Sequence, residues 1–220
     1  MKIVLGLFLI IILMSCNNNN EQVQDTNNIS GNVNYEKLLS KYKEIPMDTL
    51  KVYSPEELTG EFKGVELDSA DAVLFPKEIA EFHFHEPPGL FAVYKIKLDE
   101  KTIGLITRTP GEYVPSSIKM FLFNIEQNKI ESYLELADVW GDAGDYVRKD
   151  SWLLQDKDKQ LKVFMRVLET HTNSVEDEKD TTVIENNYYY LMHFNQKKVD
   201  TISKDESYLK KVYGELMKVD

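Results

Sequence analysis

Hydrophobic and polar side chains alternate along much of the chain after residue 90. In residues 90–98, apolar side chains occupy every second position. Because side chains two apart in an extended chain point to the same face, this pattern predicts a β-strand. Short polar turns such as residues 126–129 and 156–159 separate similar segments, which predicts an antiparallel meander. Its further strands are predicted at residues 102–109, 118–125, 130–140, 146–154, 161–168, 182–194 and 199–203.

The segments 118–125 and 161–168 are apolar on both faces. An open sheet with one face in water would not need such strands. We therefore expect the sheet to curl on itself, to stack on a second layer, or to be covered by the N-terminal helix. The predicted fold class is mainly β within α+β, and the absence of a repeat at fixed period argues against a full propeller.

Helical patterns flank this meander. Apolar residues at helical spacing in 35–42 predict a short helix that ends before Pro46, and residues 68–75 predict a turn or two of helix that ends at Pro76. Pro55 predicts the start of another helix, because proline is well placed in the first helical turn. At the far end, residues 204–220 predict a terminal helix, with Ser203 and Glu206 at the spacing of a capping box.

The N-terminus has the pattern of an export signal. Lys2 precedes an apolar run at residues 3–14 that is interrupted only by Gly6. A helix needs about 20 apolar residues to span a hydrocarbon core of about 30 Å, so this run is too short for a membrane span. Its length and the small Ser15 after it are typical of a secretory signal peptide. The alternative, a terminal anchor helix, lacks a cationic flank to halt transfer.

The motif Leu13-Met14-Ser15-Cys16 resembles the lipobox of bacterial lipoproteins. The resemblance implies cleavage before Cys16, which would then carry a diacylglyceryl thioether and an acylated amine; several acyl chains give stable anchoring. Cys16 is the only cysteine, so no disulfide is possible. The family's sorting rules imply that Asn17 directs the protein to the outer membrane of the cell envelope.

These observations divide the chain into a signal peptide, a tether and one folded domain. The tether is rich in Asn and too polar to bury a core. In the domain, a mixed helical and irregular region precedes the meander, and the terminal helix follows it. The boundaries are 1–15, 16–34 and 35–220, with 35–89, 90–203 and 204–220 inside the domain.

The net charge narrows the choice of partners. The full sequence carries a formal charge of −11, and removal of Lys2 with the signal peptide would make the mature chain more acidic still. An acidic surface repels phosphate backbones and anionic head groups. We therefore expect no nucleic-acid partner, and we expect contact with the membrane through the lipid alone.

His83 and His85 form the first candidate site. On a strand, positions i and i+2 share a face, so both imidazoles could reach one zinc ion, with His171 or His193 as a third ligand. The alternative is an amphipathic strand with two surface histidines. A lone motif of this kind matches many unrelated chains by chance.

The second candidate is the stretch around Trp140, Asp142 and Asp145, in which carboxylates beside aromatic rings could bind a sugar. We expect Trp152 to lie across the hairpin from Trp140. Asp138, with Asp142 and Asp145, could instead hold calcium, although the spacing departs from an EF-hand. A plain Gly-Asp hairpin flanked by core tryptophans is the alternative.

Common catalytic motifs are missing. The sequence contains no Gly-x-Ser-x-Gly elbow, no His-Glu-x-x-His motif and no Walker loop. We therefore expect a lipid-anchored envelope protein that acts as a non-enzymatic binding or scaffolding module, with another envelope protein or a glycan as its partner. The alternatives are a metal-dependent hydrolase that uses His83 and His85, and a periplasmic enzyme inhibitor that uses the loop at residues 140–146.

Overall fold

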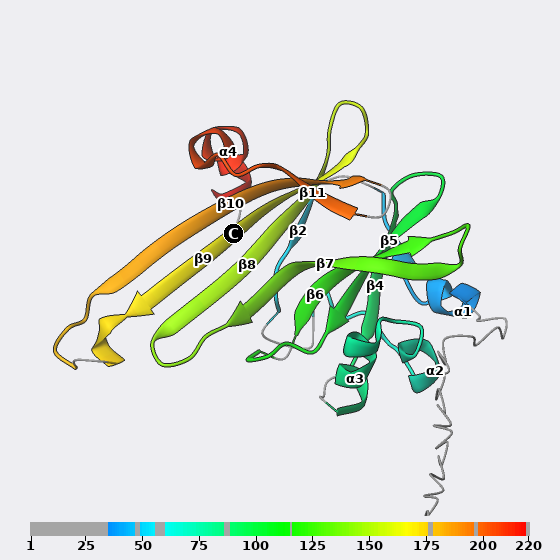
Figure 1. Cartoon of the computed structure of the whole chain (residues 1–220), viewed down its shortest axis with the longest axis horizontal. Helices are drawn as coiled ribbons and strands as arrows, with labels where there is room; N and C mark the ends of the chain where they lie inside the picture. The colour runs from blue at the N-terminus through cyan, green and yellow to red at the C-terminus, as the bar shows by residue number, and fades with distance from the viewer. Residues whose placement is uncertain are drawn as a thin grey trace, which may run out of the picture. The chain divides into compact units, whose positions relative to one another are not determined.

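The alternating segments form the strands of one large sheet, as predicted (Figure 1). The computed structural model describes residues 35–46, 49–55, 60–85, 89–114, 116–175, 178–195 and 198–218. The predicted signal peptide, lipidation site and tether, and most of the helix predicted from Pro55, lie outside these residues. The strands of the meander are β4 (Phe91–Lys97), β5 (Thr102–Thr109), β6 (Ser117–Asn124), β7 (Lys129–Trp140), β8 (Asp145–Gln155), β9 (Leu161–Thr172), β10 (Val183–Asn195) and β11 (Lys198–Ser203).

Strands β4 to β11 follow one another in the sheet in sequence order, and each neighbouring pair is antiparallel. The predicted meander is therefore confirmed. Short strands that the sequence analysis did not predict extend this 11-stranded sheet. They are β1 (Lys43–Glu44), which is parallel to β4, β2 (Leu50–Val52), which pairs with β8, and β3 (Val65–Glu66), which pairs with β4.

Strand β7 connects two halves of the sheet. Its residues up to Ala137 pair with β6, whereas Asp138–Trp140 pair with β8. The register shifts at Leu136, the kind of bulge that bends a strand. One half of the sheet packs on the other, because a single apolar cluster combines residues from both. Its members include Ile96, Ile106 and Met120 from one half, and Val52, Leu153 and Val163 from the other.

Helices explain why β6 and β9 are apolar on both faces. Helix α1 (Tyr35–Ser40) packs Tyr35 against Phe123, with ring centroids 5.0 Å apart, and Phe75 lies 4.9 Å from Phe121. Phe75 lies between the two further helices of this region, α2 (Ser69–Ala72) and α3 (Lys77–His85). At the other end, α4 (Glu206–Tyr213) covers β9, where the Tyr213 ring stacks 4.9 Å from Phe164.

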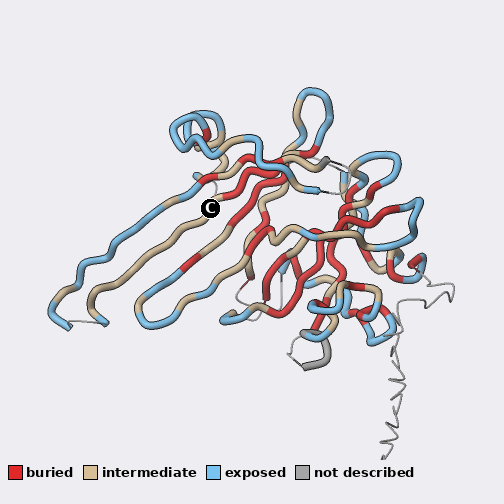
Figure 2. The backbone as a smooth tube through the Cα atoms, in the orientation of Figure 1, coloured by how far each residue is buried: buried red, intermediate tan, exposed pale blue. Residues whose placement is uncertain are grey.

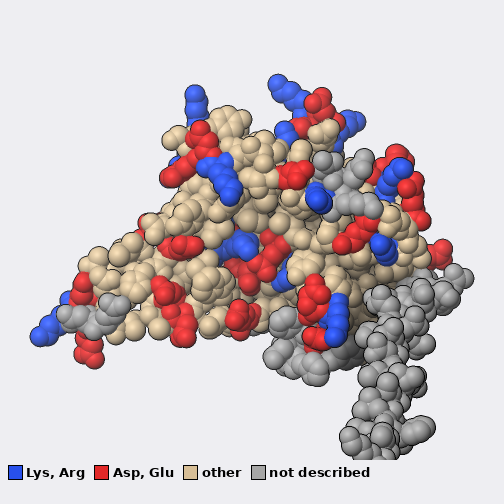
Figure 3. All heavy atoms as spheres, in the orientation of Figure 1, with Lys and Arg blue, Asp and Glu red and all other residues tan. Residues whose placement is uncertain are grey.

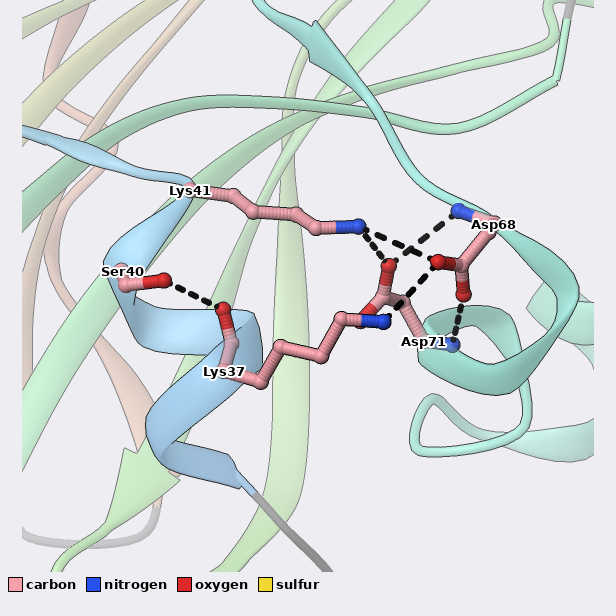
Figure 4. Close-up of polar contacts among 5 residues, drawn as sticks. All are labelled: Lys37, Ser40, Lys41, Asp68 and Asp71. Carbon is pink, nitrogen blue, oxygen red and sulfur yellow. Dashed lines mark hydrogen bonds and ion pairs between the residues drawn. The ribbon is translucent and has the colours of Figure 1, made fainter.

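Ion pairs join α1 to α2 (Figure 4). Asp68 caps α2 by accepting a hydrogen bond from the backbone N–H of Asp71, and its carboxylate lies 3.0 Å from Lys37 Nζ. The hydrogen bond from Lys37, followed by the Asp71 N–H, lowers the pKa of Asp68. Lys41 pairs with Asp71, which is almost fully buried. A buried carboxylate needs such a partner, so these contacts hold the helices over β5 and β6.

The terminal helix is confirmed, but its predicted cap is wrong. Asp205, and not Ser203, lies at the N-cap, and its carboxylate accepts a hydrogen bond from the backbone N–H of Tyr208 at 3.0 Å. The Ser203 hydroxyl instead accepts from the backbone N–H of Asp205. Ser and Asp serve equally well as N-caps, so spacing alone did not choose between them.

Candidate functional site

The histidine pair does not have the geometry predicted for it. His83 and His85 lie in α3, not on a strand, and positions i and i+2 of a helix do not share a face. The strand-based interpretation of this segment is therefore wrong. Their side chains are outside what the structure describes. His171 Nδ1 lies 2.8 Å from Asp145 Oδ1, and His193 Nε2 lies 3.7 Å from Asp200 Oδ2.

The two tryptophans have different surroundings. Trp140 pairs with Val147 across the β7–β8 hairpin and is 45% exposed. Trp152 pairs with Phe164 on β9 and is 4% exposed, with ring centroids 5.4 Å apart. The prediction that Trp152 lies across the hairpin from Trp140 is therefore wrong. Trp152 belongs to the core beneath α4, and Trp140 is available to a ligand.

The Gly-Asp stretch forms the turn between β7 and β8. The backbone N–H of Asp145 donates to the carbonyl oxygen of Asp142 at 2.9 Å, and Gly144 has a φ of +92°. A Cβ at Gly141 would lie 2.2 Å from the carbonyl oxygen of Asp145, so this position requires glycine. The backbone accounts for both glycines. Among the described residues, Asp138, Asp142 and Asp145 included, no group of three or more His, Cys, Asp or Glu could hold a metal ion.

Trp140 belongs to a face shared by β7, β8, β9 and β10, which we call the Trp140 face. Residues directly opposite one another on paired strands lie on the same side of a sheet. The pairings place Trp140 in a row with Val147, Glu169 and Asn186. The row before it contains Asp138, Lys149, Val167 and Tyr188, and the row after it contains Asp145, His171 and Ile184.

Several large apolar side chains of this face are exposed. Tyr188 is 44% exposed and Ile184 is 49% exposed. The helices pack elsewhere: α1 and the segments around α2 and α3 contact β5 and β6, and α4 contacts β9 and β10 near Phe164. The ends of β8, β9 and β10 next to the β7–β8 turn therefore extend beyond these helices. Most positions there are exposed in β10, whereas those of β9 are intermediate (Figures 1 and 2).

A pocket of about 200 Å³ adjoins the Trp140 face at Asp138. Lys119 lies in it and donates to Ser117 Oγ at 2.8 Å and to Thr109 Oγ1 at 3.2 Å. Lys119 also lies 3.1 Å from Glu135 Oε2, and Lys149 contacts the other oxygen of Glu135. The remaining lining residues include Glu78, Glu112, Tyr133 and Asp138.

The carboxylates of this pocket are in different electrostatic states. Burial alone would raise the pKa of Glu135, but Lys119 and Lys149 together lower it. Burial, and then the charge of Glu135, raises the pKa of Asp138. Asp138 Oδ1 is buried and accepts no hydrogen bond. Because both lysines are engaged by Glu135, the pocket has an unsatisfied acceptor and a surplus of negative charge, so it favours a cationic group over an anion.

Acidic and basic side chains lie side by side over the region where β7 meets β8 (Figure 3).

Comparison with known proteins finds no relative of this chain. The chain matches no family model, no curated protein and no solved structure. In the part of the chain that the structure describes, no helix is long and apolar enough to cross a bilayer.

The sequence analysis selected Trp140, Asp142 and Asp145 as candidates, but it did not predict the pocket. Lys119 lies opposite Glu135 because of the register between β6 and β7, and Asp138 lies opposite Lys149 because of the register between β7 and β8. A bulge at Leu136 separates these two registers. Alternation of apolar residues predicts that strands exist, but it does not predict where such a bulge shifts the pairing.

Proposed function

We propose that this protein is a lipid-anchored protein of the bacterial cell envelope, located at the outer membrane. We propose that it binds another envelope protein through the Trp140 face. Cys16 carries the anchor, the Asn-rich tether separates the domain from the membrane, and the protein performs no chemistry of its own. The observation that carries the proposal is the group of exposed apolar side chains at Trp140, Tyr188 and Ile184.

Aromatic residues are the most frequent anchors of protein interfaces, because they bury a large area while fixing few torsions. On the Trp140 face they lie on paired strands, so their positions are held by the sheet and little order would be lost on binding. Polar residues such as Asn186 and Glu169 lie in the same rows. The Trp140 face therefore combines apolar and polar side chains, as protein-binding surfaces do.

The charge of this region indicates a partner with basic side chains. Carboxylates of Asp138, Glu169 and the pocket outnumber the ammonium groups of Lys119 and Lys149, and both ammonium groups already pair with Glu135. Opposite charge on the partner would speed the encounter and fix its orientation. We therefore propose a partner segment that combines apolar and basic side chains.

The other functions considered from the sequence have less support. A glycan could stack on Trp140 beside Asp142 and Asp145, and this ligand is an outcome of the test below. The loop at residues 140–146 is a tight turn. An inhibitor of a periplasmic enzyme would therefore contact its target through the Trp140 face. No observation favours the hydrolase, since its histidine pair was expected on a strand and lies in α3.

The test compares opposite faces of the same strands. The double variant Trp140→Ala/Tyr188→Ala changes the Trp140 face, and Tyr146→Ala/Val183→Ala is its matched control, since Tyr146 and Val183 are similarly exposed on the other side. Each protein is immobilised and exposed to detergent-solubilised envelope extract. The Trp140→Ala/Tyr188→Ala variant, which lacks two interface anchors, should capture about one tenth as much protein as the wild type, or less. The control variant should capture as much as the wild type.

Equal capture by all the proteins, or equal loss from both variants, would contradict the proposal. The captured material is also treated with protease and, separately, with glycosidase. A ligand that survives protease and is destroyed by glycosidase would replace the protein partner with a glycan.

A further inference from the structure

Arg108 is a charged residue buried at the end of β5. It is 1% exposed, and its Nε and Nη1 atoms have no hydrogen-bond partner. No described carboxylate forms an ion pair with it. Buried charges in proteins are normally paired, and an uncompensated one costs several kcal/mol. Such a group therefore requires an explanation.

The guanidinium lies over an aromatic ring. Its central carbon is 4.1 Å from the centroid of Phe91, which is directly opposite Arg108 on β4. Glu66 lies one strand further, opposite Phe91, and is exposed. The ring satisfies one side of the cation but accepts no hydrogen bond in the plane of the guanidinium. Burial lowers the pKa of Arg108, as expected where no anion compensates it.

A second orphaned polar group lies just before the neighbouring strand, β6. Ser116 is fully buried, and its hydroxyl has no hydrogen-bond partner. Arg108 is opposite Ile118 on β6. Ser116 precedes Ile118 by two positions and comes one residue before the strand begins, so the alternation of β6, continued by that residue, puts it on the side of Arg108. Ser54 donates to the carbonyl oxygen of Ser116, so the backbone of this residue is held in place.

We propose that Arg108 and Ser116 bind the oxyanion of a small ligand, a carboxylate or a phosphate. The guanidinium can donate two parallel hydrogen bonds to such a group, one of them from an orphaned nitrogen and the other from Nη2, and the hydroxyl of Ser116 supplies another donor. Phe91, on which the guanidinium stacks, is only partly buried. The site takes an anion, whereas the pocket beside Asp138 favours a cation, so it is independent of the proposed partner-binding face.

The test measures thermal unfolding of the mature, lipidated protein in detergent. Sodium phosphate, sodium acetate and sodium chloride are titrated separately at one fixed ionic strength. Ligand binding to the folded state should raise the Tm of the wild type in a saturable manner, by about 5 °C at saturation, in phosphate or in acetate but not in chloride. The anion that acts distinguishes a phosphate from a carboxylate ligand.

Arg108→Met should abolish this response and should unfold no earlier than the wild type in chloride, because the variant removes an uncompensated charge. Arg148→Met, at a partly exposed arginine paired with Asp150, is the control and should keep the response. If Arg108→Met does not fold, Ser116→Ala provides the second comparison. It removes one charge-assisted hydrogen bond and should weaken phosphate or acetate binding about tenfold.

The proposal is overturned if the wild type responds to neither phosphate nor acetate, or if Arg108→Met or Ser116→Ala retains the full response. None of these outcomes affects the capture experiment, which depends on another face.

Discussion

Replacing Cys16 by alanine should move the protein from the membrane fraction to the soluble fraction of lysed cells. A single acyl chain gives only marginal binding, and several chains give stable attachment, so loss of all of them should release nearly all of the protein. The apolar run at residues 3–14 would not compensate, because it is too short to span a bilayer. Fractionation followed by immunoblotting measures the result.

Intact mass is the control for this prediction. The wild type should begin at Cys16 and carry the mass of a diacylglyceryl group and an amide-linked acyl chain. Unchanged fractionation of Cys16→Ala, or a wild-type mass with a bare thiol or an attached signal peptide, would contradict lipid anchoring.

Replacement of the two tryptophans by alanine should have very different effects on stability. Trp152 is buried against Phe164, so Trp152→Ala should lower the free energy of unfolding by about 3–5 kcal/mol. Trp140 is 45% exposed, so Trp140→Ala should change it by less than about 0.5 kcal/mol. Denaturant titration, followed by circular dichroism, measures both.

The same two variants distinguish a role in stability from a role in binding the partner. Trp140→Ala should lower capture of the partner while leaving the unfolding curve unchanged. A large loss of stability in Trp140→Ala would mean that this ring supports the core, and the binding proposal would lose its main residue.

The hydrophobic pattern predicted the long strands well, although β5 and β6 bury almost every position and β11 buries none. It missed β1, β2 and β3, which are only two or three residues long and show no period. The apolar faces of residues 118–125 and 161–168 predicted that other elements cover them. Which elements these are depends on contacts between distant segments, such as Phe75 with Phe121 and Tyr213 with Phe164.

The candidate sites show the limits of local pattern. The run from Phe82 to His85 alternates over too few residues to distinguish a strand from a helix, and it belongs to α3. Of the two tryptophans selected as candidates, Trp140 is exposed, whereas Trp152 is a core residue. The pocket at Asp138 and the buried pair Arg108 and Ser116 depend on register between strands, which composition does not encode.

The most direct test of the binding face is photo-crosslinking in intact cells. A photoreactive amino acid replaces Tyr188 in one strain and Tyr146 in another; these positions are about equally exposed, and they lie on opposite faces because their partners on β9 are Val167 and Thr170. We expect a discrete crosslinked protein from position 188 and none from position 146. Crosslinking from position 146 alone, or equally from both, would contradict the proposal that the Trp140 face binds the partner.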